Sequence, residues 1–294
     1  GNLIGTDATG TSQVGNGYGI FLTGPGSSSH SNLIERNVIS GNRIYGLDVR
    51  SGAHDNWIRG NLFGSDLTGS LPVPTLGNNG VNIVFQDGAH SNTLGGTAPG
   101  DGNIIVASPV AGIFLLDTGV THNTIHGNWI GTNPSMSLGL GNKAGIRLQA
   151  SNALVGGTAA AAGNVIVGNH VGLQVIVGSG NAFISNSIFG NEYRGIVLDP
   201  DTNDSIPSPV IASAVDNGTS TTVSGTASLA SPVPGVTLYL QIFTNPTCEH
   251  SPYGEGKTLL GTVTGITDGA GVASFNGTFP PGLLGQVVTA TTNT

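Results

Sequence analysis

The sequence predicts an all-β protein: a right-handed parallel β-helix (a solenoid) followed by an Ig-like β-sandwich. Asparagine recurs at every fifth position in short runs such as Asn32, Asn37 and Asn42. A motif Gly-Φ-x-Φ, where Φ is a large apolar residue, recurs along the first two thirds of the chain, and an alternating pattern replaces it after Leu198. The apolar spacing of three and four that a helix requires is absent.

Composition narrows the class of protein. The 294 residues include 49 Gly and only 8% charged residues, while the hydrophobic content of 37% argues against disorder. The net charge is −8 with only 8 Lys+Arg, so we expect no nucleic-acid partner. No apolar run approaches the roughly 20 residues of a membrane span. A single cysteine, Cys248, excludes an intramolecular disulfide framework. The chain begins inside a repeat, which predicts a mature or trimmed piece of something longer.

The asparagines are interpreted as corner residues. Residues 1–198 hold 22 Asn and the remaining 96 residues hold 5. Asparagine tolerates the left-handed backbone region, so it suits a sharp corner between two very short strands. An inward-facing amide can also stack on the amide of the next coil and satisfy backbone groups that the bend leaves unpaired. We therefore predict structural ladders of asparagine.

The Gly-Φ-x-Φ motif predicts the coils of the solenoid, residues 1–198. Its steps of 23 to 34 residues fit a stack of strand-and-corner units with about three short strands per coil. In "GIRL" the period-two rule points Ile146 and Leu148 inward and Arg147 outward. The motif begins at Gly19, Gly46, Gly80, Gly112, Gly145, Gly172 and Gly195.

The remainder of the chain predicts a second domain. Residues 199–206 are expected to form a linker or cap, and residues 207–294 an Ig-like β-sandwich of alternating strands. "TDGAG" at 267–271 is a hairpin signal. The chain ends after the strand "VTAT", so the alternative is a sandwich that lacks its last strand.

Several motifs carry a resemblance to a known family. The coils "GNLIGTDATGT", "HSNTLGGTAPGDGNIIV" and "NWIGTN" resemble bacterial secreted or surface proteins with right-handed parallel β-helix repeats of the pectate-lyase-like superfamily. The tail is similar to the Ig-like module that often follows such repeats. The resemblance implies an architecture and an extracellular or cell-surface location, but it implies no particular activity.

Enzymatic chemistry is not predicted, and no catalytic residue is assigned. Glycosidases of this fold need clustered carboxylates, whereas Asp48, Asp87, Asp117 and Asp199 each lie a coil or more from the next. Arg147 with Asp117 is the best available pair for a lyase; the alternative for Arg147 is an exposed strand residue. The seven histidines are scattered, and a spacing of four on strands is not a zinc site.

Two sets of residues are candidate binding sites. Asp199, Asp201, Asn203 and Asp204 offer oxygen ligands for calcium, the only cofactor considered; an acidic solvated linker is the alternative. Trp57 and Trp129 occupy similar slots in "NWIRGN" and "NWIGTN", which predicts two aromatic side chains on the outside of one sheet. Such side chains bind polysaccharide by stacking on sugar rings; the alternative is that each only covers its coil.

The function predicted from the sequence is that of a non-catalytic extracellular structural or adhesive protein. Solenoid ends expose unpaired backbone groups, so we expect a homo-oligomer or polymer formed head-to-tail, through the solenoid ends or by strand donation, as a filament or surface layer. The alternatives are a polysaccharide-binding module and a polysaccharide lyase or hydrolase that acts on acidic glycans.

Overall fold

A computed structural model of the chain describes residues 1–23, 29–70, 77–248 and 254–294. These residues form two compact units, Gly1–Thr202 and Asn203–Thr294. Both are built from β-strands, and the one short helical segment described is η1 (Asn203–Ser205).

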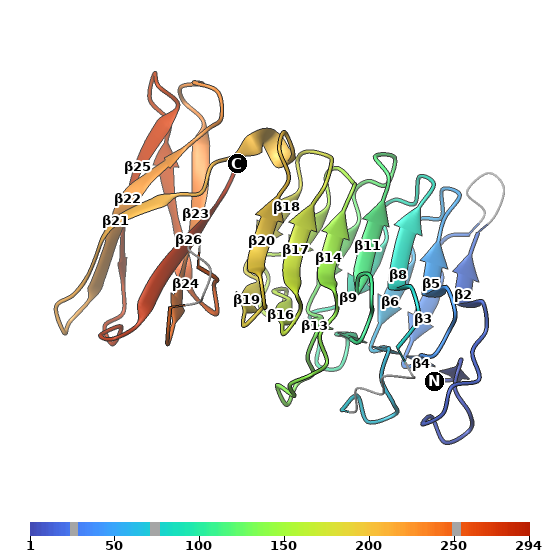
Figure 1. The fold of residues 1–294 in the computed structure, drawn as a ribbon. Coiled ribbons are helices and arrows are strands. Elements are labelled where there is room, and N and C mark those ends of the chain that lie inside the picture. The colour runs from blue at the N-terminus through green and yellow to red at the C-terminus, as the bar shows by residue number, and fades with distance from the viewer. Residues whose placement is uncertain (24–28, 71–76, 249–253) are drawn as a thin grey trace. The chain divides into compact units, whose positions relative to one another are not determined.

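The first unit consists of three parallel sheets whose strands follow one another in turn along the chain (Figure 1). Each strand pairs with the equivalent strands of the preceding and following coils, which is the arrangement of a solenoid and is consistent with the predicted β-helix. The β1–β19 sheet contains β1 (Leu3–Ile4), β4 (Val38–Ile39), β7 (Leu62–Phe63), β10 (Ile104–Ile105), β13 (Trp129–Ile130), β16 (Val165–Val167) and β19 (Ser187–Phe189).

The other two sheets complete each coil. The β2–β20 sheet contains β2 (Tyr18–Leu22), β5 (Tyr45–Val49), β8 (Val81–Gln86), β11 (Ile113–Leu116), β14 (Ala144–Leu148), β17 (Val171–Val175) and β20 (Arg194–Leu198). The β3–β18 sheet contains β3 (Leu33–Glu35), β6 (Trp57–Arg59), β9 (Thr93–Gly95), β12 (Thr124–His126), β15 (Leu154–Gly156) and β18 (Ala182–Ile184). The first coil is therefore β1, β2 and β3, and the later coils repeat this order.

The interior of the first unit is filled by columns of aliphatic side chains that the parallel register stacks one above another. In the β2–β20 sheet Leu47, Ile83, Ile113, Ile146 and Leu173 follow one another and are all fully buried. Arg147 between Ile146 and Leu148 points outward, as the period-two rule predicts. Burial of such side chains contributes about 1.5–3 kcal/mol each.

Asparagine ladders hold successive coils together. In the longest ladder each Oδ1 accepts the backbone N–H and the Nδ2–H of the asparagine one coil earlier, at 2.8–3.1 Å. This ladder comprises Asn2, Asn37, Asn61, Asn103, Asn128, Asn164 and Asn186. A second runs through Asn32, Asn56, Asn92 and Asn123, and a third includes Asn42 with Asn78 and Asn142 with Asn169 and Asn191. The predicted structural role of the amides is confirmed.

The conformational reason given for these asparagines was wrong. The left-handed residue at most corners is the one before the asparagine, for example Gly60 before Asn61 with φ +63° and His122 before Asn123 with φ +56°. The asparagine itself is selected for its side chain, because an amide can both donate to and accept from the neighbouring coils.

The glycine of the Gly-Φ-x-Φ motif is explained by the third ladder. A Cβ atom at Gly145 would lie 2.5 Å from the carbonyl oxygen of Gly172 and 3.1 Å from Nδ2 of Asn169. The same clash, with the next motif glycine and a ladder asparagine, would arise at Gly112 and Gly172. Only a residue without a side chain lets successive coils approach this closely beside the amides.

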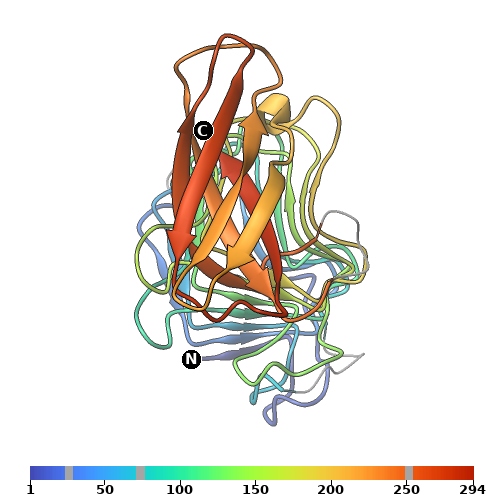
Figure 2. The same ribbon diagram turned by 90° about the vertical axis from the view of Figure 1, so that its left-hand side faces the viewer.

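The second unit contains two antiparallel three-stranded sheets, seen in Figure 2. One sheet has the order β21 (Val210–Asp216), β22 (Thr221–Ser228), β25 (Val272–Phe279); the other has the order β24 (Thr258–Ile266), β23 (Thr237–Asn245), β26 (Val287–Asn293). Alternate residues of both sheets, among them Val223, Leu240 and Phe275, share one hydrophobic core. The turn at 267–271 is not a hairpin, because β24 and β25 belong to different sheets.

Candidate functional sites

The predicted calcium ligands lie in a tightly turned segment. The carboxylate of Asp199 accepts a hydrogen bond from Nε2 of Gln174 at 3.2 Å, and its carbonyl accepts one from Oγ1 of Thr202 at 2.7 Å. Asp201, Asn203 and Asp204 all have positive φ. Within the described residues no group of three or more His, Cys, Asp or Glu side chains could hold a metal ion. Calcium binding here stays a prediction.

The two tryptophans do not share a sheet, so that expectation was wrong. Trp57 lies in β6 of the β3–β18 sheet, whereas Trp129 lies in β13 of the β1–β19 sheet. The local sequences look alike, but Asn56 belongs to the second ladder and Asn128 to the first. The two side chains therefore cannot form one row of aromatic contacts.

Trp57 is the more exposed tryptophan, at 41%, and it belongs to a charged cluster. Its Nε1–H donates to the carbonyl of Gly95 at 2.7 Å, and the guanidinium of Arg59 lies 4.3 Å from its ring centroid. Arg59 also pairs with Glu35 at 3.1 Å and with Asp101 at 3.3 Å. The guanidinium thus stacks on the tryptophan and neutralises acids of other coils.

His126 lies on the same sheet as this cluster. Burial lowers the pKa of His126, and the nearby Asp101 carboxylate opposes that shift in part. Its Nε2 atom is buried and has no hydrogen-bond partner among the described residues. At neutral pH the ring is therefore favoured in its uncharged form.

The outer face of the β2–β20 sheet carries a buried carboxylate. Asp48 points away from the aliphatic core, yet it is 0% exposed. Its carboxylate pairs with the guanidinium of Arg50 and accepts a hydrogen bond from Nε2 of Gln86 at 2.9 Å. The hydrogen bond to Asp48 raises the pKa of Arg50, and burial, followed by the charge of Asp48, raises the pKa of Tyr45. The Asp48 carboxylate thus has both an ion-pair partner and a hydrogen-bond partner within the chain.

Arg147 and Asp117, the best available pair for a lyase, form no ion pair with each other in the described part of the chain. Asp117 instead accepts the backbone N–H of Asp87 at 2.7 Å and that of Gly119 at 2.9 Å. Arg147 lies over Phe114 of the preceding coil, with 5.1 Å from its guanidinium carbon to the ring centroid. Arg50 lies over Phe21 in the same way, at 4.8 Å. The Nε atoms of both arginines are buried without a partner among the described residues.

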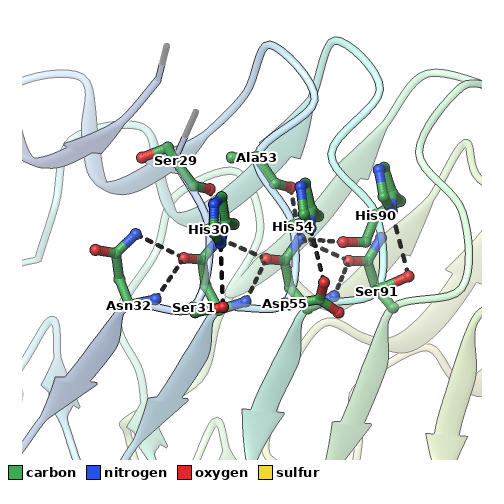
Figure 3. Close-up of polar contacts among 12 residues, drawn as sticks. Ser29, His30, Ser31, Asn32, Ala53, His54, Asp55, His90 and Ser91 are labelled. Carbon is green, nitrogen blue, oxygen red and sulfur yellow. Dashed lines mark hydrogen bonds and ion pairs between the residues drawn. The ribbon is translucent and has the colours of Figure 1, made fainter. Parts of the chain in front are cut away.

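A column of stacked histidines is the feature that the sequence analysis missed (Figure 3). His30, His54 and His90 form successive parallel bridges, with ring centroids 5.1 Å and 4.9 Å apart and interplanar angles of 10° and 4°. Each histidine precedes an asparagine of the second ladder by two residues, in "HSN", "HDN" and "HSN". That constant offset was the signal, and the description of these histidines as scattered was wrong.

Comparisons with other proteins assign neither a family nor a function to the chain. No protein-family model matches the chain, and no curated protein matches it significantly. Among the described residues no helix is long and apolar enough to cross a membrane. The class that the fold itself defines is an all-β protein with a parallel solenoid of stacked coils and an antiparallel two-sheet unit.

Proposed function

We propose that the chain is a non-catalytic extracellular structural or adhesive protein that assembles head-to-tail. In this proposal Gly1–Thr202 is a right-handed β-helix of the pectate-lyase-like type, and the second unit is an Ig-like module. The proposal is supported by the contacts within the chain, which involve the ladder amides and most of the charged side chains. Asp48 pairs with Arg50, and Arg59 pairs with Glu35 and Asp101. Such contacts favour a rigid support over a reaction centre.

The single observation that carries the assembly is the edge of the first coil. The strands β1, β2 and β3 each pair on one side only in the described part of the chain. The ladders give this edge a polarity. Oδ1 of Asn2 and Oδ1 of Asn32 accept no hydrogen bond from any described residue, so the edge presents hydrogen-bond acceptors. Two such edges facing each other would place acceptor against acceptor, so a partner must offer donors, as in head-to-tail addition.

The test compares two leucines with the same exposure. Leu33 in the edge strand β3 and Leu67 in a loop are each 51% exposed. We expect the unaltered protein to show concentration-dependent oligomers by light scattering and filaments by electron microscopy. Leu33→Lys should abolish both, because a charged side chain on an edge strand opposes pairing, whereas Leu67→Lys should abolish neither. Monomers at all concentrations would contradict the proposal.

Binding of acidic polysaccharide is the second candidate, and Arg147 favours it. Its guanidinium lies on Phe114, and no described acid pairs with it, so a ligand carboxylate or sulfate would complete its hydrogen bonding. Arg147→Gln should weaken binding of uronate or sulfated oligosaccharides at least about tenfold by calorimetry. The exposed Arg43→Gln is the control. Equal affinity in the unaltered protein and in both variants would remove this candidate. Release of unsaturated or reducing ends from the oligosaccharides would favour an enzyme instead.

A further inference from the structure

The histidine column lies at one corner of the first three coils. The backbone N–H of His54 donates to the carbonyl of Ser29 at 3.2 Å, and the backbone N–H of His90 donates to that of Ala53 at 3.2 Å, so the backbone of these two residues is bonded to the coil before it (Figure 3). The column is continued by Thr121 and Ser151, which occupy the same position in the fourth and fifth coils. Histidine therefore occupies this corner position in the first three of these five coils and not in the fourth or fifth.

The rings are oriented by their neighbours in sequence. Nδ1 of His30 and of His90 contacts the hydroxyl of the following serine, at 3.1 Å and 3.2 Å, and Nδ1 of His54 contacts Oδ2 of Asp55 at 2.7 Å. Because the rings are nearly parallel and about 5 Å apart, their nitrogen atoms are not directed at one common point. The column is thus poorly shaped to chelate a metal ion, but it is well shaped to stack uncharged rings.

Protonation would place three positive charges about 5 Å apart in a row. The carboxylate that contacts the column is Asp55, which adjoins only His54. The other charged groups within five residues of a ring are Glu35 after His30, Arg50 and Arg59 on either side of His54, and Asp87 before His90. In the fourth coil Asp117 lies on the turn that leads into the corner, and His122 lies one residue beyond Thr121. One contacting carboxylate does not offset three imidazolium ions, so repulsion between neighbouring rings remains.

We propose that the column His30–His54–His90 is an acid-sensitive element that loosens the corner of the first three coils when its rings become protonated. Histidine is the side chain that takes up a proton in mild acid, which makes acid the trigger of this element. The fourth and fifth coils, which carry Thr121 and Ser151 instead, keep their corner at the same pH. This inference concerns the single chain and does not depend on assembly.

The first test measures thermal midpoints at pH 7.5 and pH 5.0, at a concentration where light scattering gives a monomer. His54→Gln removes the central ring and both neighbouring charge pairs. We expect the unaltered protein to lose about 2–4 °C more than this variant on acidification. His122→Gln, outside the column, is the matched control and should behave as the unaltered protein. His126 remains in all three proteins, so its own acid sensitivity cancels from the comparison.

The second test locates the effect within the unaltered protein. It remains valid if His54→Gln is less stable than the unaltered protein at both pH values. Amide hydrogen exchange, corrected for the intrinsic effect of pH, should accelerate at pH 5.0 in 29–35, 53–59 and 89–95. The equivalent segments 121–126 and 151–156 should change less. An equal loss of thermal midpoint in the three proteins, or uniform acceleration over all five segments, would overturn the proposal.

Discussion

At the scale of the residue, the asparagine amide is what fastens one coil to the next. Asn128 is buried, accepts two hydrogen bonds from Asn103, and donates to the carbonyls of Leu94 and His126 and to Oδ1 of Asn164. A carboxylate could not donate and a hydroxyl could not span both neighbours, so the amide is the one side chain that satisfies the site. The ladder therefore explains the asparagine content of the first unit.

Asn128→Ala should destabilise the first unit by about 2–4 kcal/mol, because it leaves buried donors and acceptors of three coils unpaired. Urea unfolding followed by tryptophan fluorescence measures this loss. Asn79→Ala is the control, since Asn79 is exposed and only its backbone N–H enters a hydrogen bond within the described chain. Equal stability of the two variants would contradict the role assigned to the ladder.

At the scale of the element, turns of the second unit are stabilised by aspartates that accept backbone N–H groups. Asp216, at the end of β21, accepts N–H of Gly218 at 2.9 Å and those of Gly282 and Leu283 at 2.8 Å. The hydrogen bond from Gly218, then those from Gly282 and Leu283, lower the pKa of Asp216. The carboxylate thereby fixes the loop before β26 to the end of β21.

Asp216→Asn should lower the stability of the second unit at neutral pH, because the amide turns a donor toward those N–H groups. The folded pKa of Asp216 lies below its usual value, so the stability it contributes is present above the unfolded pKa and is lost as the pH falls through the folded pKa. The difference between variant and unaltered protein should therefore disappear in strong acid. Unfolding curves at pH 7 and across the acid range check this, and a difference independent of pH would contradict it.

At the scale of the whole molecule, each of the two units has a main hydrophobic core of its own among the described residues. The aliphatic columns of the first unit include Ile130, and the core of the second unit includes Phe275. Both tryptophans, Trp57 and Trp129, belong to the first unit. Tryptophan fluorescence thus reports the first unit alone, while circular dichroism reports the strands of both.

Phe275→Ala should lower the stability of the second unit by about 3–5 kcal/mol, through the cavity that it leaves. We expect part of the thermal transition seen by circular dichroism to move to lower temperature, while the tryptophan transition stays in place. Ile130→Ala should have the converse effect. Equal shifts of both signals in either variant would mean that the two units unfold as one.

The sequence by itself determined the repeating fold. The spacing of asparagine and the Gly-Φ-x-Φ motif locate strands and corners, because a short strand and a tight corner restrict the residues at each position regardless of what lies further away. The inward position of Ile146 and Leu148 and the outward position of Arg147 follow from these local rules, and the ladders follow from the regular repetition of asparagine from coil to coil.

The tertiary structure alone decided which distant residues meet. The coils differ in length, so equivalent residues are separated by 24 to 36 positions in the second ladder, and similar motifs can fall in different sheets. For that reason Trp57 and Trp129 were placed on one sheet wrongly, and the stack of His30, His54 and His90 was overlooked. Contact between coils depends on register, and the coordinates supply that register.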